Sequence, residues 1–461
     1  MLGQMGRIGI CHFRTGDIDG VSLEIDKSRQ VLHQLGHQTF LCTGRCGMGE
    51  EAFVIPEMSL DHPEVLQIRR NAFERLADYR SERDLHDHIE GVAARIEARV
   101  AEFLTGLGID LLVVHNLWGL PLNLPATVGV WRAVEVHQLP VLAHHHDFHW
   151  EREEYRSPTA AGVRDLVDKC FPPRSPRVTH IVINRIAHEE LRRRGIPSTV
   201  VPNVFDFHSS PTPRESRWAL LEHLGLSLAD VVFLQATRIV RRKGIEIALE
   251  LVARLGSPEH RGALHRRVRE RGGGFSGRPV VLLPNLVEDR GYCEALRERA
   301  ARLGVDARFV SDRVASTRRP GCLSLWDTYL CADFVTYPSL QEGWGNQFLE
   351  AVWARLPMAV YEYPVFRSDI APAGFQYVSL GHSYERDEDG LARVPEPTLR
   401  RAAQEVADLL SRPDRYRQLV EHNYALGKAR FSLQILMEEL NRLVSVALQD
   451  RPGTGREPCG R

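Results

Sequence analysis

The sequence predicts an α/β protein with two Rossmann-like domains, each built on an open parallel β-sheet. Apolar runs of about five residues alternate with longer amphipathic segments along the chain, which is the pattern of repeated β-α-β units. The 461 residues also exceed the roughly 250–300 that one hydrophobic core accommodates. Because ligands of such sheets bind beyond the carboxyl ends of the strands, we expect the two sheets to face one central cleft.

The first domain is expected over residues 1–205. Its strands are predicted at 7–13, 38–42, 111–115, 141–145, 180–184 and 199–201. Its helices are predicted at 21–35, 89–104, 122–136 and 187–194. The helix at 89–104 has the clearest pattern, because its apolar residues recur every three or four positions.

The second domain is expected over residues 206–430 and repeats the alternation. Its strands are predicted at 231–236, 280–283, 307–310, 334–337 and 358–361. Its helices are predicted at 245–255, 292–303, 324–331 and 346–355, and residues 398–448 carry only helical signals. We expect a Ser- and Pro-rich linker at 209–213, an Arg- and Gly-rich loop at 260–277 and a frayed tail at 449–461.

The bulk composition is that of a globular protein, with 43% hydrophobic residues, 26% charged residues and a formal net charge of −1. This balance provides no general field for nucleic-acid or membrane binding. No run approaches the roughly 18 apolar residues of a membrane span, and the first ten residues lack a signal-peptide core, so the cytoplasm is expected. The eight cysteines are too sparse for a disulfide framework, and reduced thiols are expected.

The strongest chemical signal is segment 339–351, Ser-Leu-Gln-Glu-Gly-Trp-Gly-Asn-Gln-Phe-Leu-Glu-Ala, between a predicted strand and a predicted helix. Two glycines flank Trp344, where the backbone can approach a ligand closely. The helix that begins near Asn346 points backbone amides and the positive end of its dipole at this loop, which suits a diphosphate. Glu342 and Glu350 can each accept sugar hydroxyls. The alternative interpretation is an ordinary turn with two surface glutamates.

A second signal, Ala-Thr-Arg-Ile-Val-Arg-Arg-Lys-Gly at 236–244, leaves a predicted strand and enters the next helix. Arg238 and Lys243 can both point at an anion held by the acidic segment. Arginine offers a bidentate fork and lysine a point charge, and both stabilise the negative charge that builds on a departing diphosphate. The alternative is a solvated basic turn.

A histidine-rich segment, Ala-His-His-His-Asp-Phe-His-Trp-Glu-Arg, occupies residues 143–152. On a strand, His144 and His146 share one face and His145 faces away. Imidazole is a good zinc ligand, so a metal site is one interpretation. Contact with a substrate is the interpretation we favour, and a purely structural role is the third. His115 ends the preceding strand and would open onto the same cleft.

The two motifs, in this order and about 100 residues apart, resemble family 4 of the retaining glycosyltransferases, which have the GT-B fold. The resemblance extends from about residue 7 to residue 445. Further agreement is found at Gly36-His37, Pro202-Asn203, Ala332-Asp333 and Pro338-Ser339. The chain departs from the family pattern at Ala236-Thr237, Val204 and Trp344. Of these departures, Val204 puts the geometry of the hinge in doubt.

This resemblance implies a role for each matching position. The implied catalytic residues are Arg238, Lys243, Glu342 and His146. The implied donor-binding residues are Gly20, Gly343, Trp344, Gly345, Asn346 and Glu350. Acceptor-binding roles are expected for Arg14, Asp19, His115, Asp147 and Arg152. The final helix, at 431–448, would cross back to the first domain.

The resemblance also implies a reaction in which the diphosphate leaves and the acceptor attacks the same face of the sugar. Fixed arginine and lysine would replace a metal ion, so neither a metal nor a cofactor is expected. Segments 16–24, 144–152 and 201–207 are similar to mannosylglucosylglycerate synthases, which implies GDP-mannose and a small anionic acceptor such as glucosylglycerate. A UDP-hexose donor, a polysaccharide or lipid-linked acceptor, and a homodimer stay open. A nucleic-acid partner is not expected.

Other classes compete with this interpretation. A phosphorylase would need a pyridoxal lysine, which we cannot locate, and an epimerase on the same fold remains an alternative. A dinucleotide-dependent oxidoreductase is disfavoured because the loop at 14–20 lacks the Gly-x-Gly-x-x-Gly spacing. A non-catalytic protein that binds nucleotide sugars would be expected to lose the charged residues of the two motifs, and here they are intact.

Overall fold

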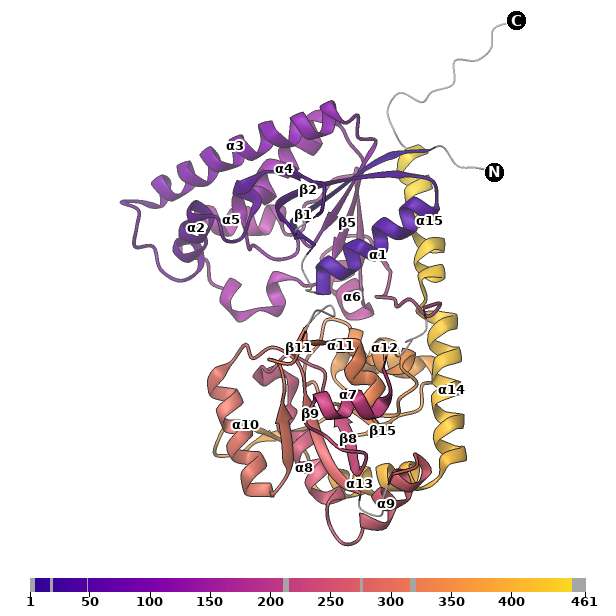
Figure 1. Cartoon of the computed structure of the whole chain (residues 1–461). Coiled ribbons are helices and arrows are strands. Elements are labelled where there is room, and N and C mark those ends of the chain that lie inside the picture. The colour runs from indigo at the N-terminus through magenta and orange to yellow at the C-terminus, as the bar shows by residue number, and fades with distance from the viewer. Residues whose placement is uncertain are drawn as a thin grey trace, which may run out of the picture. The chain divides into compact units, whose positions relative to one another are not determined.

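The computed structural model describes residues 5–16, 20–47, 49–209, 215–273, 277–315 and 321–449. The chain divides into two compact units, and Figure 1 labels their helices and strands. The first unit comprises Met1–Asn203 with Leu433–Arg461, and the second comprises Val204–Ser432. Among the described residues, no helix is both long and apolar enough to cross a membrane.

The first unit is built on a seven-stranded sheet in which every pair of neighbours is parallel. Its spatial order is β3-β2-β1-β4-β5-β6-β7. The strands are β1 (Arg7–Thr15), β2 (Gln38–Cys46), β3 (Phe53–Val54), β4 (Leu111–His115), β5 (Val141–His145), β6 (Val178–Val182) and β7 (Ser198–Val200). Strands β4 and β5 are buried along their whole length, as expected for a sheet covered on both faces.

Helices cover both faces of this sheet. They are α1 (Gly20–Gln34), α2 (Pro63–Phe73), α3 (Glu82–Gly106), α4 (Leu124–His137), α5 (Ala161–Cys170), α6 (Arg185–Arg193) and α15 (Leu433–Gln449). Figure 1 shows α1 beside α15, and α3 with α4 on the other side of the sheet. This division follows from right-handed crossovers that run in opposite directions from β1. The α15 helix also packs against β4 and β5.

The long α3 helix forms as its apolar spacing predicts. Ile89, Val92, Ile96, Val100 and Phe103 are all buried, and together they give the helix one continuous apolar face. The N-cap serine accepts a hydrogen bond from the backbone amide three residues further on, which satisfies one of the unpaired amides of the first turn. The periodicity was therefore a sufficient signal for this element.

The second unit is built on a six-stranded parallel sheet of order β10-β9-β8-β13-β14-β15. Its strands are β8 (Asp230–Leu234), β9 (Arg278–Leu283), β10 (Asp306–Phe309), β13 (Phe334–Tyr337), β14 (Met358–Val360) and β15 (Val378–Ser379). Two small sheets pair β11 (Val314–Ala315) with β12 (Leu323–Ser324), and β16 (Glu385–Arg386) with β17 (Ala392–Arg393). Its helices are α7 (Arg217–His223), α8 (Ile245–Leu255), α9 (Arg261–Glu270), α10 (Arg290–Leu303), α11 (Leu325–Cys331), α12 (Asn346–Trp353), α13 (Glu396–Ser411) and α14 (Pro413–Arg430).

The predicted α/β class with Rossmann-like parallel sheets is confirmed in both units, but one expected loop is wrong. Residues 260–277 were expected to form a loop, yet most of them form α9. Ala263, Leu264 and Val268 have the spacing of one helical face and are buried. Two arginines of this segment, Arg267 and Arg271, bind the buried carboxylate of Asp333. The high arginine and glycine content of this segment therefore led to the prediction of a loop where a short amphipathic helix forms.

Three further helices, α2, α5 and α7, were not expected from the sequence. Most of the expected linker at 209–213, and the expected tail after residue 449, lie outside the described residues.

Candidate active site

The topology of the second unit brings two loops to one place. Strand β8 lies between β9 and β13, and the chain runs from β8 to β9 on one side before it crosses to β13 on the other. This is a topological switch point, where the loops at the carboxyl ends of two neighbouring strands separate and leave room for a ligand. The loops concerned are 235–244, after β8, and 338–345, after β13.

The two loops are held together by their backbones. The amide of Leu340 donates to the carbonyl oxygen of Arg242 at 2.9 Å. Gly244 adopts a left-handed conformation (φ 56°), and a Cβ there would lie 2.5 Å from the carbonyl oxygen of Pro338. Only glycine permits both the conformation and this approach. The basic turn Arg241–Lys243 is thereby fixed against the acidic loop.

One carboxylate and two cations meet at this junction. Oε1 of Glu342 bonds to Nζ of Lys243, and Oε2 lies 3.1 Å from Arg242 Nη1. The Lys243 and Glu342 side chains are only 9% and 10% exposed. Burial lowers the pKa of Lys243, and Glu342 opposes that shift. Burial would raise the pKa of Glu342, but the positive charges of Lys243 and Arg242 outweigh the effect of burial. The pKa of this carboxyl therefore lies below its usual value. Two positive charges thus face one negative charge.

The Gly-Trp-Gly turn leads directly into α12. Gly345 is the N-cap of this helix and has φ 136°, a conformation that side chains rarely adopt. A Cβ on Gly345 would lie 2.2 Å from the Tyr363 hydroxyl oxygen. That hydroxyl donates to the Trp344 carbonyl oxygen at 2.6 Å, and the Trp344 ring packs against Phe431. Tyr363 therefore packs against this turn and supports it through a hydrogen bond. No sequence signal indicated this role.

Glu350 lies on the second turn of α12 and has a fixed partner. The buried Tyr329 hydroxyl of α11 donates to Glu350 Oε2 at 2.6 Å. Burial raises the pKa of Tyr329 well above its usual value, so the phenol keeps the proton that it donates. A hydrogen bond to an ionised acceptor holds this carboxylate in one orientation.

Arg238 pairs with a different carboxylate from Lys243. Its guanidinium pairs with Glu288, in the loop after β9, and its side chain is 45% exposed. Arg242, which the sequence analysis left unassigned, is the arginine that contacts Glu342. Arg238 still lies near enough for its charge to contribute to the lowered pKa of Lys243. The structure thus brings Lys243 and Glu342 together, with Arg242 beside them and Arg238 at the edge.

In the first unit, β1 lies between β2 and β4, which makes a second switch point. Arg14 lies near the carboxyl end of β1, and Gly20 is the first residue of α1. Asp19 lies outside the described residues. Strand β4 is next to β1 in the sheet and β5 is next to β4, and the carboxyl ends of β4 and β5 carry the histidines.

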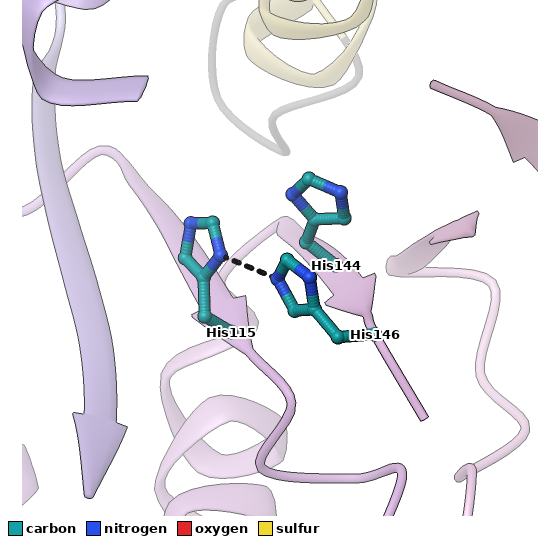
Figure 2. Close-up of side chains that lie close together, drawn as sticks. All are labelled: His115, His144 and His146. Atoms are coloured by element: carbon teal, nitrogen blue, oxygen red, sulfur yellow. Dashed lines mark hydrogen bonds between the residues drawn. The ribbon is translucent and has the colours of Figure 1, made fainter. Parts of the chain in front are cut away.

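Three histidines lie close together at the carboxyl ends of these two strands. His115 of β4 and His144 of β5 are register partners, and His146 follows two residues later on the same side (Figure 2). His115 Nδ1 lies 3.3 Å from His146 Nε2. Burial lowers the pKa of all three rings, that of His144 to about 4, so the rings are neutral near pH 7. His145 points to the other face and pairs with His180 at 3.0 Å, as strand alternation predicts.

Asn116, which follows His115 at the end of β4, fixes the backbone around these histidines. Its side-chain oxygen accepts hydrogen bonds from the amides of His146 and Asp147, at 3.1 and 3.2 Å. Asn116 has φ 52°, a left-handed conformation that asparagine tolerates better than most residues. An asparagine directly after a predicted buried strand is the one sequence signal that could have indicated this role. Asp147 in turn binds Arg152 at 3.2 Å, so these two expected acceptor residues lie together.

No family model matches the chain. It is 39% identical to the mannosylglucosylglycerate synthase of Thermotoga maritima over 442 residues, covering 95% of this chain and 99% of that protein. It is 34% identical to the enzyme of the same name from Petrotoga mobilis, covering 93% of this chain and 99% of that protein.

Solved structures agree on the fold. The structure is similar to that of Anabaena Alr3699/HepE in complex with UDP and glucose, with a TM-score of 0.60 and 14% identity over 96% of this chain and 100% of that one. This likeness shows the shared GT-B fold alone. The identity to the two synthases over nearly their full lengths decides the family. The chain is a glycosyltransferase and belongs to the mannosylglucosylglycerate synthase family.

Proposed function

We propose that the chain is a retaining hexosyltransferase that moves mannose from GDP-mannose to a small anionic acceptor such as glucosylglycerate. The name of the two relatives describes a product that contains mannose, glucose and glycerate. The segments 16–24, 144–152 and 201–207 support the same subfamily. A UDP-hexose donor, or a polysaccharide or lipid-linked acceptor, would be revealed by the assay below.

The observation that carries this proposal is the pair of cations around Glu342 at the switch point of the second unit. A donor diphosphate placed at the start of α12 would meet the positive end of the helix dipole and the charges of Lys243 and Arg242. Arg238, on the same loop, would add a further positive charge once it turns from Glu288. Glu350, oriented by its tyrosine partner, would accept the ribose hydroxyls.

The reaction follows from this charge arrangement. The bond between the anomeric carbon and the β-phosphate oxygen breaks, and negative charge builds on the leaving diphosphate. The acceptor hydroxyl forms the new bond on the same face, and its proton passes to an oxygen of the leaving phosphate. Fixed cations that already face this position stabilise the departing charge without reorganisation. Glu342 would hold the hexose hydroxyls, and no divalent ion is needed at the diphosphate.

The first unit would supply the acceptor site and one contact to the sugar. Arg14 and Arg152 are cations near the ends of β1 and β5, and either can bind a carboxylate. His146 would contact the transferred hexose, and Asn116 would hold its backbone in place. His115 would contribute to acceptor binding.

The test is transfer by the purified full-length protein with GDP-mannose and glucosylglycerate, with the product's anomeric configuration read by NMR. Retained configuration supports the mechanism, whereas inversion overturns it. Lys243→Met should lower kcat by about 10² or more, the scale of losing one preorganised charge-stabilising group. Arg241→Met is the matched control, because Arg241 lies in the same turn but pairs weakly with Asp289 at 3.6 Å.

A second measurement isolates the donor site. GDP binding, followed by calorimetry, should be unchanged by excess chelator if Lys243 and Arg242 take the place of a metal ion. Loss of GDP binding in chelator would contradict the metal-free diphosphate site. Transfer from UDP-glucose but not from GDP-mannose would replace the proposed donor while leaving the site intact.

A further inference from the structure

His115, His144 and His146 lie together at the carboxyl ends of β4 and β5, and hydrogen bonds within the described part of the chain do not satisfy all of their ring nitrogens. One nitrogen from each of His115, His144 and His146 lies within 4.8 Å of the others. Nε2 of His115 and Nε2 of His144 are buried and have no hydrogen-bond partner among the described residues. Buried polar atoms of this kind usually mark a functional site or the place of an ion or water.

The spacing of the rings is also compatible with a shared metal ion. His115 Nδ1 and His146 Nε2 lie 3.3 Å apart, at the long end of the range for a hydrogen bond. Two nitrogens on a tetrahedral zinc ion stand about 3.3–3.4 Å apart, since each Zn–N bond is about 2.0–2.1 Å. The third nitrogen, within 4.8 Å, reaches that spacing with roughly 1.5 Å of side-chain movement at most.

The chemistry of the set selects a class of ion. All three ligands are imidazoles, which suit zinc, copper, nickel and cobalt, whereas magnesium and calcium require oxygen ligands. Three protein ligands leave a fourth position for water, as in zinc sites that remain open. Figure 2 shows the three rings grouped at the ends of β4 and β5, close to one another.

We propose that His115, His144 and His146 bind one divalent transition-metal ion such as zinc, and that the bound ion lowers transfer activity. The second statement rests on the proposed function. A metal on His146 would take the ring nitrogen that otherwise contacts the hexose. The active enzyme would then be the metal-free form, and the site would make transfer sensitive to free zinc.

The binding test uses the full-length protein stripped with chelator and titrated with cobalt(II), whose visible absorption reports tetrahedral nitrogen ligation. We expect one cobalt per chain, displaced by one zinc. His144→Phe should abolish this binding. His180→Phe is the matched control, because His180 is also buried but pairs with His145 on the opposite face. Equal cobalt uptake by the wild type and His144→Phe would overturn the site.

A second readout needs no variant, in case His144→Phe does not fold. Crystals of the wild type soaked in zinc should give an anomalous peak about 2.0–2.1 Å from a nitrogen of each of the three rings. A zinc peak elsewhere, or none, rejects the proposal.

Transfer assays then separate this proposal from the function it builds on. Saturating zinc should lower wild-type kcat by about tenfold or more, since one contact that stabilises the transition state is lost. His144→Phe should not respond to zinc, which excludes sequestration of the donor by the metal. Transfer that continues unchanged with zinc bound refutes the inhibition. If no hexose is transferred under any condition while zinc still binds, the proposed function fails and the metal site stands.

Discussion

Replacing Glu342 with glutamine tests most directly the charge arrangement beyond β8 and β13. The substitution keeps the size and shape of the side chain and removes its negative charge. Lys243 and Arg242 would then face each other across a neutral amide, with no carboxylate between them. We therefore expect the second unit to lose stability before any ligand is added.

The magnitude follows from the burial of the pair. Removing one partner of a buried ion pair costs about 3–5 kcal/mol, because the other charge stays buried and uncompensated. The exposures of 9% and 10% place Lys243 and Glu342 in this class rather than among surface pairs. For a unit of this size, each kcal/mol lowers the melting temperature by about 2–4 °C, so a fall of roughly 6–20 °C is expected.

The assay is thermal melting in a buffer free of phosphate and sulfate, with and without inorganic pyrophosphate. Pyrophosphate should raise the melting temperature of E342Q more than that of the wild type, because the anion replaces the missing carboxylate. Glu288→Gln is the control, since the Glu288–Arg238 pair is surface-exposed and worth at most about 1 kcal/mol. If E342Q melts like the wild type and gains no extra stability from pyrophosphate, the two cations do not form the anion site.

Three further changes test the rest of the site. Gly345→Ala should lower stability by about 1–3 kcal/mol and raise the KM for the donor, because the new Cβ would lie 2.2 Å from the Tyr363 hydroxyl oxygen; an unchanged melting temperature would contradict this geometry. Tyr329→Phe should raise the donor KM roughly tenfold with little change in kcat, since Glu350 loses the partner that orients it; steady-state kinetics at varied donor decide this. Donor kcat/KM should fall with rising pH below the usual lysine range, because burial lowers the pKa of Lys243 and its charge is lost there; Lys243→Arg should shift this fall to higher pH, and an identical profile would exclude Lys243 as its source.

The sequence alone predicted the elements that depend on local pattern. The α3 helix followed from apolar spacing, and the strand–turn–helix segments around Lys243 and Glu342 followed from their composition. It also predicted that His144 and His146 share one face, because strand geometry alternates strictly. These are all consequences of residues within about one helical or strand repeat of each other.

What the sequence did not predict depends on partners far along the chain. Arg238 and Arg242 stand on one loop, and nothing local decides which of them meets Glu342 and which meets Glu288, some 50 residues away. The supporting hydroxyl of Tyr363 comes from the segment after β14, and only strand order brings it beneath the Gly-Trp-Gly turn. Side-chain direction at a switch point is a property of the assembled sheet.

Each unit has a topological switch point, and the strand ends at the two switch points have opposite chemical character. In the second unit, the strand ends carry charges that attract an anion and stay ionised when buried, because each sign has the other beside it. In the first unit, the strand ends carry imidazoles that burial keeps neutral, and neutral nitrogens can accept a hydroxyl proton or bind a metal ion. In the proposed reaction the cations of the second unit would hold the leaving group, because negative charge builds most at the phosphate. Exchanging these characters, for example by Lys243→His, should therefore weaken GDP binding, measured by calorimetry, and should also lower the melting temperature, because Glu342 would keep only Arg242 beside it.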